Sequence, residues 1–164
     1  MANLKNVEVF IEMPKGETRR LHLGYDKKGF VDLGQIKNVI PVNDGIMPIA
    51  YGFIMGTLQT EESEKNPNEI PDEIDILVYS KKSFKVGEIT RAVPISMLVI
   101  ENGDHKVVAV DETTSSTKKW EDIPADERDL LIRYFGYKSP IVKINGAKEA
   151  YAYIEKHRVK IRGH

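Results

Sequence analysis

The hydrophobic period changes once along this 164-residue chain, and that change constrains the fold more than any other feature. In the first two thirds, apolar residues alternate with polar ones or form short β-branched runs, which is typical of strands. In the last third they recur at helical spacing. The six strand-like runs are Val7–Glu12, Arg19–Tyr25, Gly29–Leu33, Ile74–Tyr79, Glu88–Glu101 and His105–Asp111. The chain is therefore predicted to have an α+β fold.

Turn signals separate the strand-like runs. They read "MPKGE", "YDKKG", "NDG", "KNPNEIP" and "ENGDH". In the last of these, Asn102 and Gly103 stand where a tight hairpin requires positive φ angles. Short strands joined by hairpins favour a small barrel over a parallel sheet.

The last third predicts two helices with a short strand between them. The stretch "PADERDLLIRYFGYK" begins with proline, has acids in its first turn and ends at Gly136, which predicts a helix from about Ile123 to Phe135. A second helix is predicted over Gly146–Arg158, and "SPIVKIN" reads as the strand. The stretch Thr113–Trp120 is interpreted as a polar surface loop.

Composition favours a single soluble domain over residues 1–164. The chain is long enough for one good core, and we find no linker that divides it. Its net charge of −1 gives no sign of a nucleic-acid or membrane partner. The absence of cysteine excludes disulfides and thiolate ligands, and suits a reducing compartment. With neither a signal-peptide pattern nor a membrane-spanning run in the sequence, we expect a cytoplasmic protein.

Five acidic residues lie at the ends of three predicted strands, namely Glu12, Asp72, Asp75, Glu101 and Asp104. In a small barrel, strand ends from distant parts of the chain can meet at one mouth. Carboxylates that gather without thiols or paired histidines suit a hard cation such as Mg²⁺ or Mn²⁺. The alternative is that each acid is an ordinary solvated turn residue, because Asp initiates turns for local reasons.

Basic and hydroxyl side chains are the other candidates for a site. Arg20 follows "PKGET", Lys106 lies two residues after Asp104, and Tyr137 and Lys138 follow the first predicted helix. Tyr51 opens the apolar run "YGF". Taken singly, each is more often a surface or core residue than a site residue. The four histidines have no metal-ligand spacing, so a catalytic histidine is not expected.

Six motifs in order, spread over about Val7 to Ile154, resemble those of the soluble inorganic pyrophosphatases of family I, the bacterial and archaeal type. They are "IEMPKG", "PIAYGFI", "PDEIDILV", "GDHKVVAV", "KKWEDI" with "IPADERDLLIRYFGYK", and "INGAKEAYAYIE". The resemblance implies a small closed antiparallel β-barrel, OB-like with a five-stranded core, and two helices of the C-terminal half packed on it. It also implies Mg²⁺-dependent hydrolysis of pyrophosphate or a related phosphoanhydride, and a homo-oligomer, usually a hexamer.

The resemblance also implies roles for the candidate residues. Asp72 would orient or deprotonate the attacking water. Metal ions would be held by Asp75, Asp104, Glu12 and Glu101, the last as a longer replacement for an aspartate. Phosphate oxygens would be bound by Arg20, Tyr51, Lys106, Tyr137 and Lys138.

Several positions depart from the family pattern, among them Pro71 and Glu73, which replace a glycine and a proline. Ile70 stands in place of a metal-binding aspartate and Leu33 in place of a phosphate-binding arginine, while His22 and Met47 replace a glutamate and a tyrosine. Two functions therefore stay open at the level of sequence. One is the hydrolase; the other is a non-catalytic protein of the same fold that binds a phosphorylated metabolite or a protein partner.

Overall fold

The computed structural model describes residues 5–24, 29–59 and 72–159, and this part of the chain is built mainly of strands with two α-helices. The strands are β1 (Val7–Met13), β2 (Arg19–Leu23), β3 (Phe30–Gln35), β4 (Ala50–Ile54), β5 (Asp75–Tyr79), β6 (Ile89–Ile100), β7 (Lys106–Val110) and β8 (Ile141–Gly146). The helices are α2 (Ala125–Phe135) and α3 (Ala147–Lys156). Ile70 lies outside the described residues.

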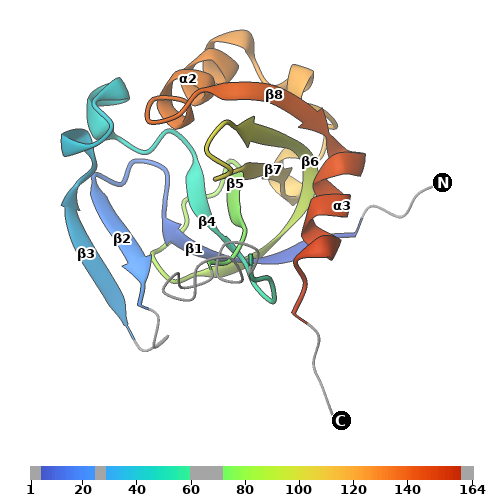
Figure 1. Cartoon of the computed structure of the whole chain (residues 1–164), viewed down its shortest axis with the longest axis horizontal. Coiled ribbons are helices and arrows are strands. Elements are labelled where there is room, and N and C mark those ends of the chain that lie inside the picture. Colours follow the sequence, from blue (N-terminus) through green and yellow to red (C-terminus); the bar gives the residue numbers. More distant parts are fainter. Residues whose placement is uncertain (1–4, 25–28, 60–71, 160–164) are drawn as a thin grey trace.

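Five strands form a ring in the order β1-β4-β5-β7-β6, which closes because β6 also pairs with β1 (Figure 1). β8 extends this sheet beyond β6, and β2 and β3 form a separate two-stranded sheet, seen at the left of Figure 1. The predicted α+β fold with a five-stranded core and two helices is confirmed. One detail differs from an all-antiparallel barrel, since β5 and β7 pair in parallel.

β4 is the strand that the sequence pattern did not reveal. All five of its residues are buried, so polar and apolar positions do not alternate along it. Gly52 faces β1 so closely that an added Cβ atom would lie 2.0 Å from the carbonyl oxygen of Phe10. Only glycine fits at such an approach of two backbones. This tight pairing fixes Tyr51, the neighbouring residue, between β1 and β5.

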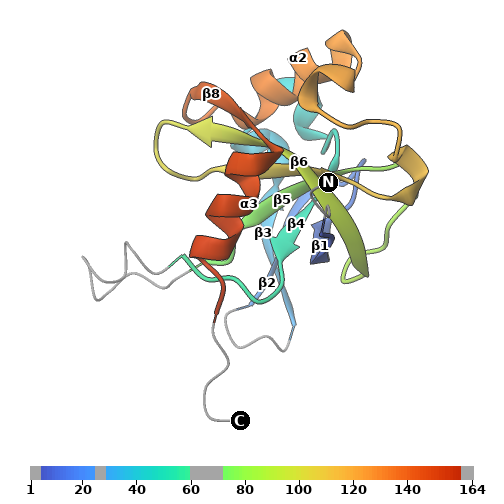
Figure 2. The same cartoon turned by 90° about the vertical axis from the view of Figure 1, so that its right-hand side faces the viewer.

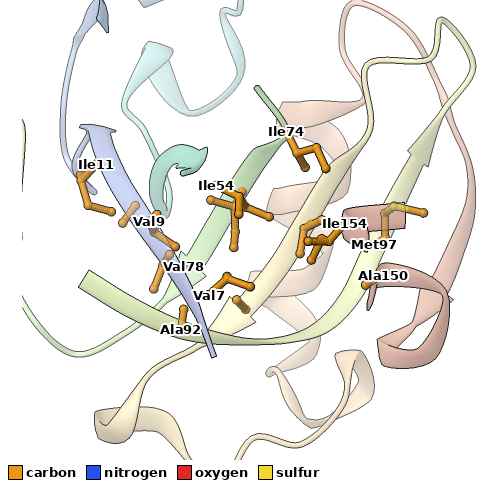
Figure 3. Close-up of a cluster of buried hydrophobic side chains, with 14 of the residues drawn as sticks. Val7, Val9, Ile11, Ile54, Ile74, Val78, Ala92, Met97, Ala150 and Ile154 are labelled. Atoms are coloured by element: carbon orange, nitrogen blue, oxygen red, sulfur yellow. The ribbon is translucent and has the colours of Figure 1, made fainter. Parts of the chain in front are cut away.

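The hydrophobic core has two parts, on opposite sides of the ring strands. In the first, shown in Figure 3, Val7, Val9 and Ile54 pack with Ala150 and Ile154 of α3. In the second, α2 packs on the other side of the strands through its buried residues, which are Leu131, Tyr134 and Phe135. Figure 2 shows α3 lying along the strands on one side and α2 at the top. Alternate residues of a strand point to opposite faces, so each ring strand contributes to both parts.

Local details correct the sequence-based interpretation at two places. α2 begins two residues later than predicted. The stretch Thr113–Trp120 is not a simple surface loop, because Thr114, Thr117 and Trp120 are buried. The Thr114 hydroxyl donates to the carbonyl of Tyr79 over 2.6 Å, which anchors the stretch to the end of β5. Within the described residues, no helix has the length and apolarity needed to cross a membrane.

Candidate active site

The parallel pairing of β5 and β7 brings a carboxylate and an ammonium group together. Asp75 is the first residue of β5, Lys106 is the first of β7, and the two are direct partners in the register. Lys106 Nζ lies 2.6 Å from Asp75 Oδ2 and 2.9 Å from Asp104 Oδ2. It also stands 5.6 Å from the ring centre of Tyr51 in β4. One lysine, 6 % exposed, thus connects two carboxylates that are 29 residues apart in sequence.

The three charges of this cluster perturb one another. Burial raises the pKa of Asp75 to about 6, and the negative charge of Asp104 adds to the effect of burial while Lys106 opposes it. Burial also acts to raise the pKa of Asp104, but attraction to Lys106 together with the hydrogen bonds to Lys106 and Asp75 outweighs it, and the pKa is lowered. Burial acts to lower the pKa of Lys106, and the two carboxylates reverse this, so that the lysine stays charged. Burial, followed by the charge of Asp75, raises the pKa of the Tyr51 phenol well above its usual value.

Four of the predicted acids border one cavity of about 390 Å³, here called the acidic cavity. They are Glu12, Asp72, Asp75 and Asp104. They reach it from the end of β1, from the residues at the start of β5 and from the turn before β7. Leu33, half exposed on β3, lines the same cavity. The sequence interpretation had grouped these acids because each stood at a strand end.

A second cavity, of about 210 Å³, lies beside the first, and we call it the cationic cavity because Arg20, Lys106 and Lys138 line it. The two cavities share Tyr51, Asp104 and His22 in their linings. Carboxylates therefore line the acidic cavity, and three cationic side chains line the neighbouring cationic cavity. Such a layout separates groups that bind a metal from groups that bind an anion.

Glu12 connects the barrel to the β2–β3 sheet. It is buried, and its Oε2 atom accepts a hydrogen bond of 2.7 Å from the backbone N–H of Leu23. His22 Nδ1 lies 3.8 Å from the same oxygen. Glu12 thus holds β2, which carries Arg20 and His22, against the mouth of the barrel.

Two predicted site residues stand apart from these cavities. Tyr137 has 53 % of its surface exposed and borders neither of them. Glu101 is exposed in the turn between β6 and β7, borders neither cavity, and its backbone N–H donates to the carbonyl of Pro140 over 2.9 Å. Their roles stay predictions.

Sequence reasoning missed part of the lining. His22 borders both cavities; the sequence marks it only as a replacement for a family glutamate and gives it no role. Asn102 and Ser139 also line the cationic cavity, and the Asn102 backbone N–H donates to Ser139 Oγ over 3.1 Å. Asn102 and Ser139 are far apart in the sequence, and no motif indicates that they lie close together. Only the pairing of β6 with β8 brings these two turns together.

The acidic cavity suits a divalent cation by its chemistry, since its polar lining offers carboxylate oxygens and no thiolates. Among the described residues, however, no three acidic or histidine side chains stand close enough together to hold a metal ion. The ammonium group of Lys106 occupies the space between Asp75 and Asp104. Binding a cation at these two carboxylates would therefore require the Lys106 side chain to move away from at least one of them.

Sequence comparisons match this chain to a family model and to known proteins. The family model described as inorganic pyrophosphatase matches residues 9–160. An inorganic pyrophosphatase of Aeropyrum pernix is 34 % identical over 98 residues, which is 55 % of this chain and 51 % of that protein. One from Picrophilus torridus is 28 % identical over 150 residues, covering 85 % of this chain and 77 % of that protein. The match thus spans about half the length of the first relative and about three quarters of the second.

Solved structures share the fold. The crystal structure of inorganic pyrophosphatase from Ehrlichia chaffeensis superposes with a TM-score of 0.79 at 22 % identity, covering 95 % of this chain and 96 % of that one. Inorganic pyrophosphatase from Thermus thermophilus gives a TM-score of 0.74 at 21 % identity, covering 94 % and 95 %. At these identities the likeness concerns the fold.

Proposed function

The chain belongs to the inorganic pyrophosphatase family, and from that premise we propose that it hydrolyses inorganic pyrophosphate to two phosphate ions with a divalent cation, Mg²⁺ or alternatively Mn²⁺. The observation that carries the proposal is the acidic cavity beside the cationic cavity, with Tyr51 and Asp104 at their boundary. Hydrolysis of pyrophosphate uses both kinds of group. Cationic side chains bind the phosphate oxygens, and carboxylates hold the metal ion and accept a proton from the attacking water.

Asp75, Asp104 and Glu12 are the residues proposed to hold the cation: their carboxylates border one cavity, and they would have to come closer together than they stand in this structure. When bound, the cation would supply positive charge for the phosphoryl oxygens and make water more acidic. Lys106 balances Asp75 and Asp104 when no cation is present, and on binding its ammonium group becomes available to a phosphate oxygen. That transfer of Lys106 from carboxylate to substrate is part of the proposal.

Asp72 is proposed to take the proton of the attacking water. It is exposed, lies at the border of the acidic cavity and precedes β5. Asp75 borders the same cavity, but burial raises its pKa to about 6 and its carboxylate is paired with Lys106. A general base has to reach the attacking water, which favours the exposed Asp72 for this role.

Arg20, Lys138 and the Tyr51 hydroxyl are proposed to bind the phosphate oxygens. Arg20 offers a planar fork of donors and Lys138 a point charge. Tyr51 stays protonated near neutral pH because burial raises its pKa, so its hydroxyl is available as a donor. Tyr137 and Glu101 border neither cavity, and the proposal gives them no contact with the substrate.

The test is phosphate release from pyrophosphate with Mg²⁺, with Mn²⁺ and with a chelator. Wild-type protein should release phosphate with either metal and none with the chelator. Asp72→Asn should lower turnover by about 10²-fold or more, because an amide cannot accept the proton. The matched control is Asp126→Asn, the same change at an exposed position in the first turn of α2.

A result without phosphate release under any metal would reject the hydrolase. Calorimetric titration with pyrophosphate then separates two cases. Binding without turnover would favour the alternative of a phosphate-binding protein without catalysis. If pyrophosphate does not bind at all, both the hydrolase and the binding protein are rejected.

The predicted homo-oligomer and the cytoplasmic location are also kept as proposals. Sedimentation velocity of the whole chain measures the first, with a hexamer as the expected species. Cell fractionation measures the second.

A further inference from the structure

The cationic cavity has an extensive apolar lining. Beside its three cations, it is lined by Met13, Ile36, Val39, Ile40, Met47, Ile100 and Phe135. Several of these are almost fully buried, among them Ile36 and Met47 at 2 % and 4 % exposure. We call these residues the apolar wall. Most of the wall residues also pack in the second part of the core, and Val39 and Ile40 are the more exposed ones. Our proposed function uses the cations of this cavity and assigns the apolar wall no part in binding.

The backbone behind the apolar wall is held in a strained form. Asn43, Asp44 and Gly45 have φ angles of 56°, 55° and 74°, so three consecutive residues are left-handed. A Cβ atom on Gly45 would lie 2.4 Å from the backbone nitrogen of Lys37, so the segments before and after residue 40 pack directly on each other. The Asn43 side chain donates to the carbonyl of Ile46 over 2.9 Å and fixes this turn. Strain of this kind persists only where surrounding contacts hold it, which indicates a preformed wall.

An inorganic anion gains nothing from such a wall. A phosphoryl oxygen placed against Ile36 or Met47 would lose its hydrogen bonds to water without a replacement. An alkyl group in the same place would be removed from water, which is favourable by about fourfold in affinity for each buried methylene. The wall therefore fits a ligand that has an apolar group next to its phosphates.

The size of the cavity limits that group. A volume of about 210 Å³ is below the 300 to 1,000 Å³ that is typical of drug-sized sites. At roughly 30 Å³ for each water-sized unit, it holds about seven such units. This is enough for a short branched alkyl chain and too little for a nucleoside together with its phosphates.

We propose that the substrate range extends to monoesters of pyrophosphate with a short apolar alcohol, a proposal that rests on the proposed function of the same site. The terminal phosphoryl group would lie at the acidic cavity, the inner one between Arg20, Lys106 and Lys138, and the alkyl group against the apolar wall. Water adds to the terminal phosphorus and the bond to the bridging oxygen breaks. The alkyl monophosphate leaves with the electron pair, and one proton of the water passes to Asp72 and then to solvent.

The test compares the ratio of kcat/KM for an ester to that for pyrophosphate, with methyl diphosphate and 3-methylbutyl diphosphate as the esters. The longer ester should be cleaved more than tenfold better than methyl diphosphate, since burial of two of its extra methylenes already gives about 16-fold. Ile40→Asn should lower the ratio for the longer ester about tenfold, because a polar amide then faces the alkyl chain. Ile89→Asn is the matched control, at a residue that is 52 % exposed on β6 and borders neither cavity.

The outcomes distinguish the two proposals. If pyrophosphate is hydrolysed while the two esters are cleaved equally well, or if Ile40→Asn leaves the ratio unchanged, the extended substrate range is wrong and the hydrolase stands. If nothing is hydrolysed, the proposed function fails, and calorimetry with methylenebisphosphonate and its 3-methylbutyl ester tests the apolar wall alone. Tighter binding of the ester to wild type, lost in Ile40→Asn, supports the wall; equal binding overturns it.

Discussion

At the scale of single residues, Lys106 explains how two acids are tolerated side by side in a buried position. Its ammonium group lies between Asp75 and Asp104, and it is itself buried at the first position of β7. Carboxylates brought together from separate strands would otherwise repel one another in a region of low dielectric. In the folded chain, the positive charge of Lys106 thus balances the two carboxylates, as a divalent cation bound there would.

The first prediction removes this balance with Lys106→Gln. A buried charge left without its partner destabilises a protein by about 3 kcal/mol, although here the partly exposed Asp104 lowers the cost. We expect a clear fall in melting temperature in a chelator and partial recovery in Mg²⁺, because the cation replaces the lost charge. Lys148→Gln, an exposed position on α3, is the control. A melting temperature equally low with and without Mg²⁺ would mean that the cation does not bind at Asp75 and Asp104.

A second prediction concerns acid stability and Asp111. This buried carboxylate accepts hydrogen bonds from Ser80 Oγ, Thr113 N and Thr113 Oγ1 at 2.5, 2.9 and 2.6 Å. Burial acts to raise its pKa, but these bonds outweigh burial and lower the pKa below the ordinary value of 3.8. The stabilisation is therefore complete above about pH 4 and is lost as the pH falls through the lower, folded-state value.

Urea unfolding of Asp111→Asn at pH 7, 5 and 3 checks this. At pH 7 and 5 the variant should be less stable than wild type by about 1 to 3 kcal/mol, the usual cost of a disturbed buried hydrogen-bond group. At pH 3 the difference should shrink, since the unfolded chain then takes up a proton at Asp111 more readily than the folded chain does. A difference independent of pH would mean that the charge of Asp111 contributes nothing.

At the scale of elements, the site depends on how closely β4 approaches β1. Gly52→Ala would place a methyl group 2.0 Å from the Phe10 carbonyl oxygen, so one of the two backbones has to shift. We expect a loss of several kcal/mol in the free energy of unfolding, at the upper end of what single substitutions cause. Tyr51 would be displaced with the strand. Gly103→Ala is a useful contrast: its Cβ would meet no neighbour, and its φ of 87° alone would cost less.

Some elements were predictable from sequence and some were not. The segments that became β6, β7 and α2 have clear periods and turn residues, and the structure has them within a few residues of the predicted bounds. β4 gave no period because both of its faces are buried. Four of the five acids at strand ends border one cavity, and the fifth, Glu101, does not. Much of the apolar wall (Ile36, Val39, Ile40 and Met47) comes from the segment between β3 and β4, whose position no local pattern encodes.

At the scale of the whole molecule, cation binding and folding should be linked. The acidic cavity draws its carboxylates from the end of β1, the start of β5 and the turn before β7, so it exists only when the ring is formed. A ligand that binds only the folded state stabilises it by about 2.7 kcal/mol at a concentration 100 times its Kd. For a chain of 164 residues this corresponds to a rise in melting temperature of about 5 to 10 °C.

The measurement is thermal unfolding in Mg²⁺ and in K⁺ at equal ionic strength, with the Kd taken from calorimetry. General screening of charges acts alike in both salts, so only a specific site separates them. Asp75→Asn should lose most of the Mg²⁺ effect, because it removes the buried carboxylate that the proposed cation contacts, and Asp126→Asn should keep it. Equal melting temperatures in the two salts would mean that Mg²⁺ does not bind at this site. Lys106 would then stay paired with Asp75, and no cation would displace it.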